Sequence, residues 1–271
     1  MSTRVRILSG LAGAPGLWDE TVAELTRLRP DVSADVADVP WHAQAGGGWA
    51  EPGWDPQQAT SRLVRSGDVL VAHSFAASLV LAHLCGRDRV QPRAAVIVSP
   101  FYRSSARDFR WSTLEHFLTR FDEFLETGLV SRTGHRIDPE IRRAMARSVR
   151  DRMGAYGWMA FMSAYLATPA AETAAATVPV HVVYGTADGV APPADAVELA
   201  RVLPWARLHP VEAGDHFPMT TDPALVAGVV RDAIDRSAHR TVHPRSARAA
   251  TARSSHQPVP RGRRQPRKEL T

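Results

Sequence analysis

The sequence predicts an α/β protein built on a doubly wound, mostly parallel β-sheet. Two observations support this fold class. Segments of strand character alternate with segments of helical spacing along most of the chain. The strand segments are mostly continuous apolar runs, as expected where helices cover both faces of a sheet. The chain has 271 residues, of which 44% are hydrophobic, and this is enough for one substantial core.

The individual elements follow from apolar spacing and from residues that start or stop helices. We expect strands at residues 4–10, 31–40, 68–72, 94–100, 178–185 and 206–211. Apolar residues recur at helical spacing in residues 16–28, 55–67, 75–86, 192–204 and 222–237. Asp55 is a suitable N-cap for the second of these helices and Gly67 a suitable stop, while Pro192 suits the start of the fourth.

A long helical segment, residues 101–176, interrupts the alternation. Its first apolar helix is expected to carry large apolar side chains on one broad face: Leu114, Phe117, Leu118, Phe121, Phe124 and Leu125. A second apolar helix follows in residues 153–167, and the segment holds four of the six methionines: Met145, Met153, Met159 and Met162. The expected organisation is therefore a core of residues 1–100 and 177–237, a helical insertion of residues 101–176, and a tail.

The tail, residues 238–271, carries the basic charge of the chain. It holds nine Lys/Arg and one acid, Glu269, a net charge of 9 − 1 = +8, which leaves 5 − 8 = −3 for the remainder. Its Arg, Pro and Ser content and its lack of large apolar residues predict a disordered, solvated extension. A basic tail can bind phosphates nonspecifically, but we do not infer a nucleic-acid function from it.

Several other classes are not favoured. Cys85 is the only cysteine and is expected to be a buried small hydrophobic residue. The stretch MSTRVRILSG lacks the pattern of a signal peptide, and no window approaches the ~18 consecutive apolar residues of a membrane span. His42, His83 and His116 lack metal-ligand spacing. We therefore expect a cytoplasmic protein with no metal, no membrane association and a small-molecule substrate, in an unknown oligomeric state.

A serine stands where the third expected strand turns into a helix. Ligands of such sheets bind at the carboxyl ends of the strands, so these ends are candidate sites. In the segment AHSFA, Ser74 is flanked two residues away by Ala72 and Ala76. A sharp strand-to-helix turn would hold the serine in a strained conformation and would require small residues at both positions. This pattern favours Ser74 as a nucleophile.

Two later strand ends supply the groups that would activate this serine. The fifth strand ends in GTADGVAP, which presents Asp188, and the sixth ends in EAGDHFP, which presents His216. An imidazole can remove the hydroxyl proton while a carboxylate orients the ring and stabilises its cation. Asp215 is a competing acid, but a neighbour in sequence cannot readily orient the ring that follows it, so we expect it to cap or to face solvent. His73 is expected to pack away from Ser74.

The turn after the first strand offers backbone donors. The stretch SGLAGAPGLW contains Gly10, Gly13 and Gly16. A flexible turn here lets the N–H of Leu11 point into the site, where the N–H of Phe75 would complete an oxyanion hole. The turn lacks the Lys-Ser/Thr of a P-loop and the glycine spacing of a dinucleotide-binding motif.

Four segments in this order, SGLAGAPGLW, VAHSFAAS, YGTADGVAP and AGDHFP, resemble the alpha/beta-hydrolase superfamily over residues 4–237. The resemblance implies Ser74 as nucleophile, Asp188 as acid and His216 as base. It further implies the amides of Leu11 and Phe75 as donors, a minimal sheet of about six strands, a helical cap over the site, and no cofactor. Family members usually carry Gly where this chain has Ala72 and Ala76, and often His-Gly where it has Ser9-Gly10.

The cap suggests the substrate. Methionine and aromatic side chains make adaptable apolar walls, although most of them are expected to form the core of the cap. We expect Trp18, Phe101, Trp158 and Phe217 to contact the substrate. A loop tryptophan, Trp41, Trp49 or Trp54, is a further candidate for the rim. An arginine clamp for a charged substrate, from Arg103, Arg107 or Arg110, is the polar alternative.

These features predict a serine hydrolase, a carboxylic ester hydrolase of a fairly apolar small molecule, acting through an acyl-enzyme. Thioester, lactone or carbon–carbon hydrolysis and cofactor-free peroxidation remain alternatives on the same residues. Dehalogenation is disfavoured, because it uses a carboxylate nucleophile. A non-catalytic small-ligand receptor that keeps only the pocket is the alternative of another class.

Overall fold

The computed structural model describes residues 3–42 and 54–242 of the chain. Six parallel strands form one sheet in the order β2-β1-β3-β4-β5-β6. The strands are β1 (Arg4–Leu8), β2 (Ser33–Val36), β3 (Val69–His73), β4 (Ala94–Val98), β5 (Val180–Gly185) and β6 (Ala206–Val211). The predicted doubly wound α/β fold is confirmed. The strand order changes direction between β1 and β3. Since all six strands are parallel, their carboxyl ends lie on the same side of the molecule.

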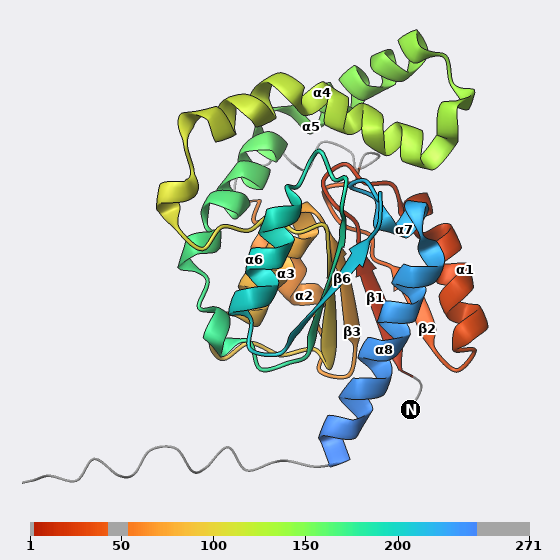
Figure 1. Ribbon diagram of the computed structural model, residues 1–271, viewed down its shortest axis with the longest axis vertical. Helices are drawn as coiled ribbons and strands as arrows, with labels where there is room; N and C mark the ends of the chain where they lie inside the picture. Colours follow the sequence, from red (N-terminus) through yellow and green to blue (C-terminus); the bar gives the residue numbers. More distant parts are fainter. Residues whose placement is uncertain (1–2, 43–53, 243–271) are drawn as a thin grey trace, which may run out of the picture.

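Helices cover both faces of the sheet (Figure 1). One face carries α2 (Pro56–Leu63), α3 (Phe75–Leu84) and α6 (Pro193–Val202). The other carries α1 (Asp19–Leu28) and α8 (Pro223–Val242). Short 3₁₀ turns and one short α-helix lie between the longer elements. They are η1 (Pro15–Trp18), η3 (Ala106–Asp108), η4 (Gly134–Arg136), η5 (Thr168–Ala170), η6 (Thr173–Ala175) and α7 (Pro218–Thr221).

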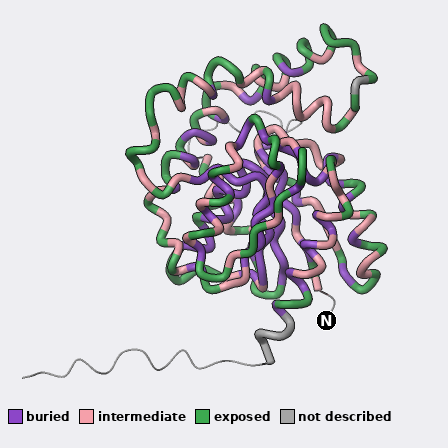
Figure 2. Tube along the Cα trace, viewed as in Figure 1, coloured by how far each residue is buried: buried purple, intermediate pink, exposed green. Residues whose placement is uncertain are grey.

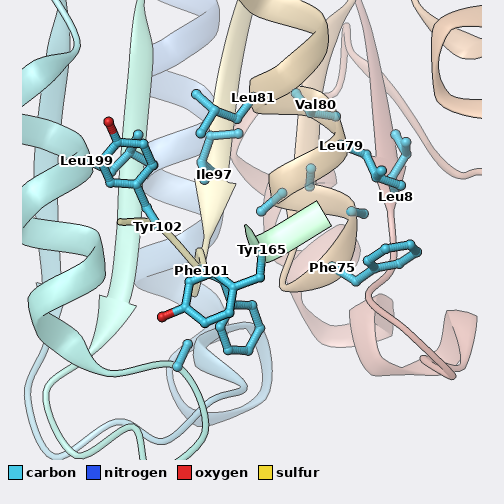
Figure 3. Close-up of a cluster of buried hydrophobic side chains, with 14 of the residues drawn as sticks. Leu8, Phe75, Leu79, Val80, Leu81, Ile97, Phe101, Tyr102, Tyr165 and Leu199 are labelled. Atoms are coloured by element: carbon cyan, nitrogen blue, oxygen red, sulfur yellow. The ribbon is translucent and has the colours of Figure 1, made fainter. Parts of the chain in front are cut away.

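The strand residues divide alternately between two cores. In β3, Leu70 and Ala72 pack with α3 and α6, while Val69 and Val71 pack with α1 and α8. Burial on both faces explains why the strand reads as an unbroken apolar run. Figure 2 shows the buried residues concentrated at the sheet. Figure 3 shows the first core, in which Phe101 and Tyr165 lie together beneath α3.

The insertion forms two long helices, α4 (Trp111–Thr133) and α5 (Pro139–Leu166). They lie beyond the carboxyl ends of the strands, which places the insertion over that edge of the sheet (Figure 1). Within α5 the backbone of Gly154 leaves the helical region, with φ 63° and ψ −172°. Glycine tolerates this positive φ without a steric penalty, so the helix changes direction there.

Several predicted element ends differ from the structure, among them the following three. The helix that begins after the Asp55 cap ends at Leu63 rather than near Gly67, because Val64 is extended and buries its side chain in the core. The second strand is shorter than predicted and spans Ser33–Val36 at the sheet edge. The last helix continues to Val242 rather than ending at 237, since no proline interrupts residues 224–242. The rest of the predicted tail lies outside the described residues.

A histidine pair on the sheet, with His181 buried and His209 half-buried, makes stability depend on pH. His181 and His209 stack on β5 and β6 with Nδ1 and Nε2 of the two rings 3.0 Å apart. Burial, followed by the repulsion of His209 and Arg207, lowers the pKa of His181 to about 4. The neutral ring is therefore preferred in the folded state, and the stability it contributes is present above pH 6.5 and lost as the pH falls toward 4.

We expect His181 to account for a loss of about 3 kcal/mol in the free energy of unfolding between pH 6.5 and pH 4. Asp195 acts in the opposite direction, because burial raises the pKa of its carboxyl to about 6. Denaturant unfolding of wild type and His181→Gln across this pH range separates the effect of His181 from that of Asp195. The variant should lose only the part of the acid-induced destabilisation that His181 contributes, because the pKa values of His42, His73, His83 and His209 are also lowered. The difference between the two proteins at pH 8 measures the packing cost of the substitution. Parallel stability curves for the two proteins would contradict this assignment.

Candidate active site

Ser74 occupies the sharp turn between β3 and α3. Its φ of 56° and ψ of −120° lie in a region of backbone angles that residues other than glycine rarely adopt. Its N–H donates to the carbonyl oxygen of Val98 at 2.9 Å. Ala72 and Ala76, two residues to either side, are fully buried. Strain of this kind persists only when the surrounding structure enforces it. The strained turn predicted from the small flanking residues is present.

The three predicted side chains form one hydrogen-bonded chain. His216 Nε2 lies 3.0 Å from Ser74 Oγ, and His216 Nδ1 lies 2.8 Å from Asp188 Oδ2. All three residues are buried. Since an ionised carboxylate can only accept, Nδ1 carries the proton and Nε2 is left to accept from the serine hydroxyl. The imidazole is therefore in the tautomer that can remove a proton from Ser74.

The carboxylate is held by its own loop. Asp188 Oδ1 accepts from the backbone N–H groups of Val190 and Ala191, each at 2.8 Å. The competing acid has another role. Asp215 Oδ1 accepts from the N–H of Phe217 at 2.8 Å, and its Oδ2 accepts from Ser131 Oγ on α4 at 3.0 Å. Asp215 thus stabilises the turn after His216 and connects it to α4. Of the two expectations for this residue, capping and exposure to solvent, the hydrogen bond to the N–H of Phe217 agrees with capping.

The glycine turn after β1 lies directly against the serine. A Cβ on Gly10 would lie 2.9 Å from both Ser74 Cβ and His73 Nδ1, so only glycine lets the backbone approach this closely. Trp41 stabilises the residue before this turn, because its Nε1–H donates to the carbonyl oxygen of Ser9 at 2.8 Å. Leu11 follows Gly10 and lines the same cavity as Ser74. Phe75 is the first residue of α3, where N–H groups have no acceptor within the helix.

His73 contributes more than the packing expected of it. Its Nε2–H donates to the carbonyl oxygen of His216 at 2.9 Å, and its ring contacts those of His216 and Phe217. Burial, with the nearby His216, holds the pKa of His73 well below its ordinary value, so the ring stays neutral. His73 therefore fixes the backbone of the residue that faces Ser74. Its place beside the serine was the only sequence signal for this role.

A cavity of about 240 Å³ opens above Ser74 and His216. The Gly10–Ala14 turn forms one side, and α4 and α5 form the cover. Most of the lining side chains are apolar, among them Phe101, Phe117, Phe121, Phe124, Phe161 and Phe217. The hydroxyl, the imidazole and the glycine turn therefore meet at the floor of an apolar chamber.

The comparisons with known proteins agree with this arrangement. The model of the alpha/beta hydrolase family matches residues 7–229. The chain belongs to the alpha/beta hydrolase family. No curated protein matches it in sequence.

Solved structures of this family share the fold at low identity. The N-acyl homoserine lactone degrading enzyme Est816 is 16% identical, with a TM-score of 0.63 over 86% of this chain and 93% of its own. An esterase from Thermogutta terrifontis is 17% identical, with a TM-score of 0.57 over 86% and 90%. A thioesterase domain from the curacin biosynthetic pathway is 15% identical, with a TM-score of 0.56 over 85% and 91%.

Two of the four aromatic residues predicted to bind substrate line the cavity of this alpha/beta hydrolase. Phe101 and Phe217 are among its walls. Trp18 is not, because it is fully buried beneath the site, where its Nε1 donates to Ser9 Oγ at 3.2 Å. Trp158, a residue of α5, is also absent from the lining and packs against the core. The structure therefore places neither tryptophan in the cavity wall, since composition alone does not show which way a side chain faces.

The apolar cap residues of the hydrolase divide in a similar way. Met145 lines the cavity, whereas Met153 and Met162 are buried in the core and Met159 is exposed. Leu118 is 57% exposed and does not belong to the apolar face predicted for it. Of the loop tryptophans, Trp41 is buried, Trp54 packs against the core, and Trp49 lies outside the described residues.

The arginines named for a possible clamp lie elsewhere. Arg103, Arg107 and Arg110 do not line the cavity. Arg103 Nε–H donates to Tyr165 Oη at 3.0 Å, and its Nη2 lies 3.2 Å from Asp195 Oδ1. This buried network joins the start and end of the cap to α6, which is a structural role.

The described residues lack two features that are typical of other classes of protein. Within residues 3–42 and 54–242, no group of three or more His, Cys, Asp or Glu side chains is arranged to hold a metal ion. Among the same residues, no helix is long and apolar enough to cross a membrane. Cys85 is buried as predicted, and burial raises the pKa of its thiol to about 11.

Proposed function

We propose that this hydrolase cleaves carboxylic esters of fairly apolar small molecules through an acyl-enzyme intermediate. The observation that carries the proposal is the hydrogen-bonded chain from Ser74 through His216 to Asp188, at 3.0 and 2.8 Å. A serine hydroxyl is a weak nucleophile unless a base accepts its proton during attack. Ser74, the first member of this series of hydrogen bonds, lies at the floor of an apolar cavity, where an ester can reach it.

The first half of the reaction forms the acyl-enzyme. Ser74 Oγ attacks the ester carbonyl carbon while His216 Nε2 takes the hydroxyl proton, and Asp188 stabilises the resulting imidazolium. The N–H groups of Leu11 and Phe75 donate to the oxyanion of the tetrahedral intermediate. One such donor typically contributes about 3 kcal/mol to transition-state stabilisation.

The second half releases the products. His216 gives its proton to the leaving alkoxide oxygen as the carbon–oxygen bond breaks, and the alcohol departs. A water molecule then loses a proton to His216 as it attacks the acyl carbon, and Ser74 recovers its proton when the acid leaves. The sum is one ester and one water converted to one acid and one alcohol.

The apolar lining supports an uncharged, apolar body next to the scissile bond. Each methylene that enters the cavity contributes about 0.8 kcal/mol, which is roughly fourfold in kcat/KM. A panel of p-nitrophenyl esters of graded acyl length should therefore show kcat/KM rising with length until the cavity is filled. Thioester and lactone counterparts belong in the same panel, because they undergo the same attack.

A fluorophosphonate probe tests the alternative of a ligand receptor without turnover. The hydrolase should be labelled at Ser74, because the probe requires an activated serine. A protein that neither hydrolyses any member of the panel nor reacts with the probe would contradict the proposal. Labelling combined with turnover of thioesters or lactones alone would replace the ester assignment.

A further inference from the structure

The apolar lining of the cavity ends in arginine on both cap helices. On α4, Phe121, Leu125, Gly128 and Leu129 line the cavity at helical spacing, and Arg132 follows on the same side. On α5, Met145 and Val149 line it, and Arg152 follows one turn later. Residues three or four apart share one face of a helix, so each apolar stripe leads to a guanidinium.

The two arginines lie at the exposed edge of the cavity, while Ser74 is buried at its floor. Arg132 reaches from the cap to the core, since its Nη2 would lie 3.7 Å from a Cβ on Gly16 at the start of the protein's first 3₁₀ turn. Among the described residues that line the cavity, none is Asp or Glu. The lining therefore carries the positive charges of Arg132 and Arg152 and no carboxylate.

Three other arginines of the insertion are paired with carboxylates, whereas Arg132 and Arg152 are not. Arg120 pairs with Glu123, Arg150 with Asp122, and Arg142 with Glu126. Within residues 3–42 and 54–242, neither Arg132 nor Arg152 has a carboxylate within 4 Å. The hydrogen bond of Arg152 is from Nε to the carbonyl oxygen of Ser148 at 3.4 Å, which leaves its terminal nitrogens available.

One acid competes for Arg132 at the rim. Asp19 Oδ2 would lie 3.3 Å from the same Cβ on Gly16, so it lies on this side of the cavity without forming an ion pair. A second anion can therefore bind Arg132 without first breaking a salt bridge. Arginine suits this purpose because its planar donors match the two oxygens of a carboxylate.

We propose that Arg132 and Arg152 form an anion subsite at the rim, and that the substrate is an ester whose apolar chain ends in a carboxylate. The inference rests on the proposed function, because it takes Ser74 as the point of attack. The apolar stripes hold the chain, and the guanidinium group at the end of either stripe holds its charged end. The preferred substrates are thus half-esters of dicarboxylic acids or esters of hydroxy acids, rather than simple alkyl esters.

The test compares charged and uncharged probes of equal length. For the acyl side, the probes are the p-nitrophenyl half-ester of suberic acid and p-nitrophenyl octanoate. For the alcohol side, they are the acetate ester of 8-hydroxyoctanoic acid and octyl acetate. The variants are Arg132→Gln, Arg152→Gln and the double variant. Arg143→Gln, on the exposed surface of α5 and outside the cavity lining, is the matched control.

The double variant should lower kcat/KM for the charged probe of at least one pair about fivefold, as expected when one exposed ion pair is lost. Its effect on the uncharged partner should stay within about twofold, since no charge contact is lost there. In wild type, the preference for the charged probe should fall in about 1 M salt, where the Debye length is about 3 Å. The control variant should behave as wild type. Equal effects on charged and uncharged probes of both pairs would overturn the inference.

A binding measurement separates this inference from the proposed function. Calorimetry with Ser74→Ala follows the same uncleaved probes and needs no turnover. Tighter binding of the charged probe that is lost on adding Arg132→Gln and Arg152→Gln supports the subsite even if wild type hydrolyses no ester. Hydrolysis by wild type with no charge preference in rate or binding overturns the subsite and leaves the esterase proposal standing.

Discussion

Replacing Ser74 with alanine is expected to lower kcat for p-nitrophenyl ester hydrolysis by about four to six orders of magnitude. The substitution removes the oxygen that attacks the carbonyl, and His216 is left without a proton to accept. The fold should persist, because the serine side chain bonds only to His216 among the described residues. Single-turnover kinetics measure the loss, and denaturant unfolding checks that the variant is folded.

Ser78→Ala is the matched control for this prediction. Ser78 lies one turn further along α3, is similarly buried, and is not part of the cavity lining. Its hydroxyl bonds to the carbonyl oxygen of Phe101 at 3.4 Å, so its loss should change kcat less than about threefold. Comparable losses in the two variants would show that Ser74 acts through folding and would remove the basis of the acyl-enzyme mechanism.

Gly185→Ala is expected to destabilise the protein by about 3 kcal/mol or more and to abolish most of the activity. Gly185 ends β5, and a Cβ there would lie only 2.2 Å from the carbonyl oxygens of Gly214 and Asp215. These atoms belong to the backbone, so no side-chain rotation relieves the clash. Since Asp188 follows Gly185 and His216 follows Asp215, the substitution must push apart the loops that bring the two side chains within 2.8 Å.

The control for Gly185→Ala is Gly189→Ala, in the same loop. A Cβ on Gly189 would meet no atom within 4 Å, so this variant should keep its activity and its free energy of unfolding within about 0.5 kcal/mol. Urea unfolding and ester hydrolysis measure both variants. If Gly185→Ala retained wild-type stability and rate, the close approach of the two loops would not control the site.

Much of the candidate site could be predicted from the residues that follow the ends of the strands. The carboxyl ends of parallel strands lie at one edge, so residues that follow β3, β5 and β6 are neighbours although more than 100 positions separate Ser74 from Asp188. The structure brings Ser74, Asp188 and His216 into one hydrogen-bonded chain and sets the glycine turn beside it. Their roles in catalysis stay a prediction.

The sequence did not indicate which side chains face the cavity. Trp18 and Phe101 are both large aromatics near strand ends, yet Trp18 is buried beneath the site while Phe101 lines it. Arg132 and Arg152 read as ordinary charged residues of helical segments. Their position at the rim depends on how the two cap helices rotate and cross over the sheet, which local spacing does not determine.

By itself, the sequence determined the alternation of elements, the parallel sheet, and the candidates at its strand ends. These follow from local apolar spacing and from small or helix-starting residues, whose preferences act over a few positions. The tertiary structure alone decided the tautomer facing Ser74, the tight approach at Gly185, and the two arginines at the rim. Each of these depends on contacts between segments far apart in the chain, and such contacts are set by packing rather than by any local pattern.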